Sequence, residues 1–72
     1  MLNSMQPGAT VGIATVRYRK LIAHVGVVLR QDRKAVTIDT SDGELVIPLA
    51  KIKCFRVGSL ESVLAFKREW ES

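Results

Sequence analysis

A period of two in the placement of apolar side chains constrains this chain more than any other feature of its sequence. From Leu21 to Leu29 every second residue is apolar, and shorter stretches with the same period occur between residues 11 and 57. Successive side chains of a β-strand point to opposite faces, so this period predicts strands rather than helices. The set that starts at Leu21 is expected to face the core, and the set that contains His24 and Gly26 to face away from it.

Five short strands are expected, joined by short turns. The segments that carry the pattern are residues 11–18, 21–29, 35–40, 44–48 and 51–57. Arg19-Lys20 is expected to form the turn of a first hairpin. Asp42-Gly43, a pair that supplies positive φ, is expected to form the turn of a second hairpin. The residues expected to point inward from the third and fourth strands are Val36, Ile38, Leu45 and Ile47.

Gly26 stands in the middle of the second predicted strand. A glycine at such a position usually marks a bulge or a sharp bend, the device by which a small sheet curls. Short antiparallel strands with a bend of this kind predict a mostly β fold: a five-stranded, strongly bent antiparallel small barrel.

The pattern changes at Gly58-Ser59. Ser59 is a favourable N-cap residue, Glu61 suits a first helical turn, and apolar residues then recur at helical spacing, so a C-terminal α-helix is predicted from about residue 60 to residue 69. An isolated helix of this length is marginal in water, and its apolar side, with Phe66 and Trp70, must therefore dock. It is expected to seal one open end of the barrel or to pack on a neighbouring subunit.

The 72 residues are enough for one small domain. Its expected parts are a flexible leader over residues 1–9, the barrel over residues 10–57 and the helical segment over residues 58–72. A domain of this size buries only about 60% of the surface that its unfolded chain exposes, so its stability is marginal. The single cysteine, Cys54, cannot form an internal disulfide, and one cysteine with one histidine cannot assemble a metal site. Self-association is therefore expected to supplement the core.

The charge of the chain is unevenly distributed. Eleven basic and seven acidic residues give a net charge of +4, and nine of the basic but only four of the acidic residues precede Gly58. A basic body attracts polyanions, RNA or DNA first and an anionic membrane surface second. No stretch approaches the roughly 20 apolar residues of a membrane span, and the N-terminus lacks the pattern of a signal peptide, so a cytoplasmic protein is expected.

The residues capable of catalysis stand apart from one another. His24 has no serine or cysteine nucleophile near it in sequence. Cys54 alternates with its neighbours on a predicted strand, which is typical of an inert structural thiol. Asp39 and Asp42 flank a hairpin turn and suit turn chemistry. We therefore expect a non-catalytic protein that uses no cofactor and no metal.

Two motifs in the predicted barrel resemble those of the Sm-like family, whose small barrels assemble into RNA-binding rings. In the first, Gly26 is followed after a hydrophobic stretch by Asp32, and the alternating Val36-Thr37-Ile38 comes next. In the second, an apolar strand, a very short turn and a fifth strand lie within residues 44–52. The resemblance covers about residues 11–57. It implies a homo-oligomeric ring, formed by pairing the fourth strand of one subunit with the fifth strand of the next, that binds single-stranded RNA.

The chain departs from the family at the positions that read bases. Lys34 stands where the family usually has a stacking residue, Val36 where eukaryotic members have an asparagine, and Pro48-Leu49-Ala50 where the bacterial host-factor proteins have Tyr-Lys-His. The helix also follows the barrel instead of preceding it. The resemblance and the basic body together therefore imply RNA binding mainly through phosphates. The cations expected to make these contacts are Arg33, Lys34, Lys51 and Lys53.

Other interpretations stay open. Residues 40–48 are similar to the Asp-Gly and Ile-Pro hairpin in the β-domain of the small mechanosensitive channels, itself an Sm-like barrel, which favours an oligomer without indicating RNA. SH3-like barrels of the ribosomal and translation-factor type share the strand pattern. The alternative function is a protein-interaction or scaffold module with an SH3-like barrel, in which the helix face around Phe66 and Trp70 binds a partner.

Overall fold

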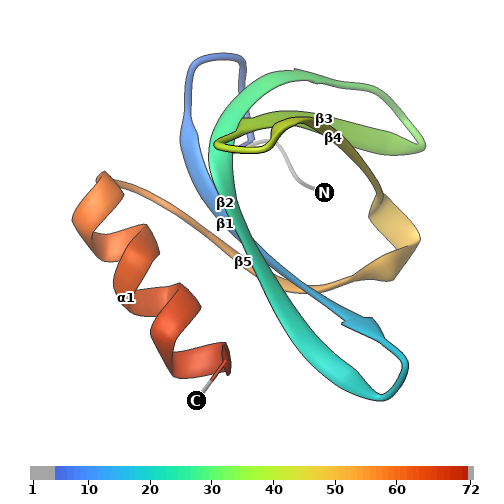
Figure 1. Ribbon diagram of the computed structural model, residues 1–72. Helices are drawn as coiled ribbons and strands as arrows, with labels where there is room; N and C mark the ends of the chain where they lie inside the picture. The colour runs from blue at the N-terminus through green and yellow to red at the C-terminus, as the bar shows by residue number, and fades with distance from the viewer. Residues whose placement is uncertain (1–4, 72) are drawn as a thin grey trace.

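The structure, a computed structural model, describes residues 5–71. Its elements are β1 (Thr10–Arg17), β2 (Lys20–Gln31), β3 (Ala35–Thr40), β4 (Gly43–Pro48), the short 3₁₀ helix η1 (Leu49–Lys51), β5 (Ile52–Val57) and α1 (Leu60–Glu71). All strand pairs are antiparallel, and the order across the sheet is β4-β3-β2-β1-β5 (Figure 1). The predicted fold class, mostly β with five antiparallel strands and a C-terminal helix, is confirmed.

The sheet curls strongly but does not close into a complete barrel. β4 pairs with β3 and β5 pairs with β1, while no ladder joins β4 to β5 within residues 5–71. Both of these strands are therefore edges of the sheet. Pro48, which has no N–H to donate, ends β4 on one of these edges, a position that suits it.

The concave side of the sheet holds the core. Val36, Ile38 and Ile47 are buried there, and Leu45 packs against them, as the period of two predicts. The other buried members of this cluster are Met5, Val11, Ile13 and Val28. The core is thus built from four strands and from the segment that precedes the first of them.

Residues 5–9 pack against the sheet. The Met5 side chain is buried, the Gly8 N–H donates to the Val28 carbonyl at 2.8 Å, and the Val28 N–H donates to the Ala9 carbonyl at 2.8 Å. The predicted flexible leader therefore meets ordered structure over its second half, and its first four residues lie outside the described part of the chain.

The two faces of β2 are the reverse of the prediction. Residues directly opposite each other in an antiparallel ladder share a face, and the core residue Ile13 is paired with His24. His24 and Gly26 therefore lie on the core side, and the set that starts at Leu21 lies on the outer side. The prediction was wrong because both faces of β2 carry apolar residues: one borders the core, and α1 packs on part of the other.

Gly26 is buried against the backbone of β3. A Cβ atom at this position would lie 2.5 Å from the Asp39 carbonyl oxygen, so only glycine fits. The β2–β3 register shifts between Val28 and Arg30, just beyond it, and β2 bends through this region (Figure 1). The bend predicted for Gly26 is thus a close approach between two backbones followed by a bulge.

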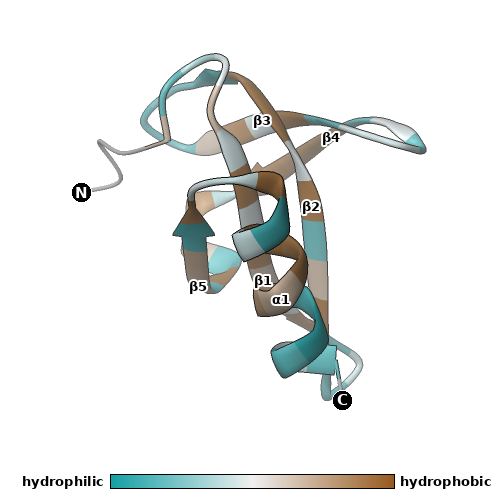
Figure 2. Cartoon of the chain, turned by 90° about the vertical axis from the view of Figure 1, so that its left-hand side faces the viewer, coloured by the Kyte–Doolittle hydropathy of each residue, from teal (hydrophilic) through white to brown (hydrophobic). Residues whose placement is uncertain are grey.

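α1 lies on the outer face of β1, β2 and β5 (Figure 2), so it does not seal an open end of the barrel as one prediction had it. Its buried residues Val63 and Phe66 pack onto Gly12, where a Cβ atom would lie only 2.8 Å from the Phe66 ring. The Ser59 hydroxyl accepts the Ser62 N–H at 3.2 Å, which confirms the predicted N-cap.

Gly26→Ala is expected to lower the free energy of unfolding by about 1 to 3 kcal/mol, because the added methyl group must push the β3 backbone away. Gly58→Ala is the matched control: its Cβ atom would lie 3.7 Å from the Ser62 hydroxyl oxygen, an ordinary contact. Urea denaturation of both variants measures the difference. Equal stability of the two variants would contradict the account of the bend.

Candidate nucleic-acid interface

Three connections lie on the same side of the curled sheet. They are the β1–β2 turn, the β2–β3 loop and η1, and all three lie on the right-hand side of Figure 1, whereas α1 lies on the left. The Leu49 N–H donates to the Lys34 carbonyl at 2.8 Å, which joins η1 to the β2–β3 loop. A shallow hollow lined by Arg17 and Ile22 on one side and by Pro48 and Lys51 on the other lies between the β1–β2 hairpin and η1.

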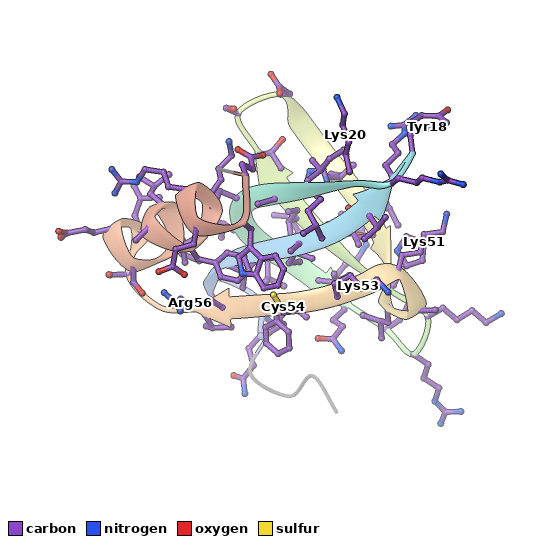
Figure 3. All side chains as sticks on the ribbon, turned by 90° about the horizontal axis from the view of Figure 1, so that it is seen from below. Tyr18, Lys20, Lys51, Lys53, Cys54 and Arg56 are labelled. Carbon is purple, nitrogen blue, oxygen red and sulfur yellow. The ribbon has the colours of Figure 1, made fainter. Side chains whose placement is uncertain are left out.

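This end of the molecule concentrates positive charge. Seven cations with exposed side chains lie on or beside the three connections, and we call this surface the basic end: Arg17, Arg19, Lys20, Arg33, Lys34, Lys51 and Lys53. Figure 3 shows Lys20, Lys51 and Lys53 on the same side of the molecule as Tyr18. Six of the seven acidic residues are elsewhere, on the β3–β4 hairpin and on α1. With Asp32, the basic end carries a net charge of +6, whereas the four basic and six acidic residues outside it sum to −2.

The four cations predicted from the sequence all belong to the basic end. Arg33 and Lys34 lie in the β2–β3 loop, Lys51 in η1 and Lys53 in β5, and each is exposed. The structure brings the first pair next to the second through the contact of Leu49 with the Lys34 backbone. They form one surface, although Lys51 comes 17 positions after Lys34 in the sequence.

Asp32, the acidic residue within these connections, organises the β2–β3 loop. Its Oδ1 accepts the Lys34 N–H at 2.7 Å and the Ala35 N–H at 2.9 Å. The hydrogen bond from the Lys34 backbone, and then that from Ala35, lowers the pKa of the Asp32 carboxyl. The carboxylate thus fixes the turn that presents Arg33 and Lys34 to solvent.

The β1–β2 turn is the part of this surface that the sequence reasoning missed. It is centred on Tyr18-Arg19, one residue before the predicted step, since Arg17 pairs with Lys20. Both central residues have positive φ, 52° and 65°, the pattern of a type I′ hairpin turn that usually takes asparagine and glycine. For other residues this conformation costs about 1 to 2 kcal/mol each. An aromatic residue within a basic run, Arg17-Tyr18-Arg19-Lys20, was the signal available in the sequence.

His24 lines the hollow between the hairpin and η1, and Cys54 follows Lys53 in β5; both side chains are half-buried. Burial lowers the pKa of the His24 imidazole, whose Nε2 is 3.4 Å from the Thr15 hydroxyl oxygen. Burial raises the pKa of the Cys54 thiol, which disfavours the reactive thiolate. Within residues 5–71 no three His, Cys, Asp or Glu side chains gather as a metal-binding group would require.

No family model, curated protein or solved structure gives a significant match to this chain, so its resemblance to the Sm-like family stays a prediction. Over the described residues, no helix has the length and apolar character needed to cross a membrane.

Proposed function

We propose that this chain is a non-catalytic RNA-binding protein that works as a homo-oligomeric ring and holds RNA mainly through its phosphates. The observation that carries the proposal is the basic end, where three connections far apart in sequence present exposed cations on one surface. Lysine and arginine side chains attract phosphates without reading sequence. Binding is therefore expected to be salt-sensitive and weakly selective. The location that we propose for it is the cytoplasm.

The two free edges of the sheet support the ring. β4 and β5 are each six residues long, and each has one side without a strand partner in the described chain. Unpaired edges invite association, and pairing β4 of one subunit with β5 of the next removes both. Val46 on β4 is 59% exposed, a large aliphatic side chain that a neighbouring strand could cover. Because the subunits of such a ring are identical, the ring would repeat the basic end once per subunit.

The helix face that would bind a partner in the alternative scaffold function packs partly against the sheet. Phe66 is 3% exposed against the sheet, and its ring lies 6.1 Å from that of Trp70, centroid to centroid. The Arg56 guanidinium lies 5.5 Å from the Phe66 ring centroid. Phe66 is therefore unavailable to a partner, Trp70 is half-buried, and we favour the basic end over the helix as the binding surface.

The double variant Arg33→Ala/Lys34→Ala is expected to weaken binding to a short single-stranded RNA. For a single strand, each phosphate contact contributes about 0.7 to the slope of log K against log salt, so losing two contacts should reduce the slope by about 1.4. Fluorescence anisotropy titrations across a series of KCl concentrations measure both quantities.

The matched control is Lys67→Ala/Arg68→Ala on α1, which removes the same charge from the opposite side of the molecule. Equal losses in both double variants would show a response to net charge rather than a site. Unchanged affinity in the loop variant would overturn the assignment. Affinity that does not respond to salt would favour the scaffold function.

Light scattering of the nuclease-treated protein is expected to give the mass of several subunits. Val46→Lys should break this particle into monomers, because a charge on an edge strand opposes strand pairing. Val27→Lys, on the central strand β2 at 39% exposure, is the control and should leave the assembly intact. A monomeric wild-type protein would contradict the ring.

A further inference from the structure

Tyr18 is held in an unusual position for an aromatic residue. It is 86% exposed at the tip of the β1–β2 hairpin, and its backbone has φ 52°. Asparagine or glycine would adopt this conformation with less strain. The ring is not packed in the core but lies beside the Arg17 guanidinium, so the strain of this turn points to a role on the surface.

The surroundings of the ring suit a nucleotide. The Arg17 guanidinium lies 5.4 Å from the ring centroid, and Arg19 and Lys20 follow directly in the chain. Behind the tip, the hollow between the hairpin and η1 is lined by Arg17 and Lys51 as well as by apolar residues of β1, β2 and β4. A base stacked on the Tyr18 ring would thus have cations beside it for the phosphates on either side.

We propose that Tyr18 is a stacking platform for an unpaired base, so that the basic end takes single-stranded rather than duplex RNA. This inference rests on the proposed function, which supplies the phosphate contacts. Aromatic side chains next to a positively charged groove are the common means of binding single strands, since every base has a face on which to stack and no sequence is read. In a duplex the bases are stacked on each other, and the ring has no partner.

Tyr18→Asn tests the proposal, because it removes the ring while fitting the turn better. We expect the variant to unfold at a higher urea concentration than the wild type and yet to bind oligouridine about fivefold or more weakly, in line with the loss of one stacked base. Tyr18→Phe keeps the ring and should keep the affinity. Opposite changes in stability and in binding cannot arise from a damaged fold.

Two further measurements distinguish the stacking role of Tyr18 from the proposed phosphate binding by the basic end. An RNA duplex should bind the wild type and Tyr18→Asn equally, and the salt dependence with oligouridine should be the same for both proteins, since no cation is lost. Wild-type affinity of Tyr18→Asn for oligouridine, with salt dependence retained, would overturn the stacking role and leave phosphate binding standing. Failure of the wild type to bind either RNA would overturn both.

Discussion

The close approach of the Asp39 carbonyl to Gly26 is the contact on which the rest of the structure depends. With 2.5 Å between that oxygen and the place of a Cβ atom, no other residue lets β3 follow the bend of β2. The bend turns Val28 and Ile38 toward a common core. It also carries the β2–β3 loop round to η1, where the Lys34 carbonyl meets the Leu49 N–H. The basic end is therefore a consequence of the curl.

The second constraint is that β1 and β2 contact the core on one face and α1 on the other. β1 contributes Val11 and Ile13 to the core, and its Gly12 contacts α1 on the opposite face. The helix covers the outer face around Gly12 with Val63 and Phe66, which is why Phe66 is not free for a partner. β4 and β5 each keep an edge without a strand partner in the described chain, so pairing through these edges would bury further surface of this small domain.

Local patterns predicted most of the fold. The period of two located all five strands, Ser59 located the start of α1, and Gly43 has the positive φ, 110°, expected of the Asp-Gly turn. The same period could not say which face of β2 is inside, since both faces carry apolar residues and the helix that covers one of them comes from the far end of the chain. The direction assigned to His24 was wrong for this reason.

The site was only partly predictable for a similar reason. Arg33, Lys34, Lys51 and Lys53 were identified from charge and from a resemblance, but their proximity depends on the bend at Gly26. The turn at Tyr18-Arg19 was not predicted from the sequence, because neither residue is typical of a turn with positive φ. Neither residue is buried in the core, and departures of this kind from local preference are expected at functional positions.

Lysine footprinting tests the central claim most directly. The chain has five lysines: Lys20, Lys34, Lys51 and Lys53 at the basic end, and Lys67 on α1 as an internal reference. Mass spectrometry after brief acetylation, with and without single-stranded RNA, measures the protection of each. The account predicts that RNA protects the four lysines of the basic end and leaves Lys67 as reactive as before. Protection of Lys67 with the other four unchanged would contradict it.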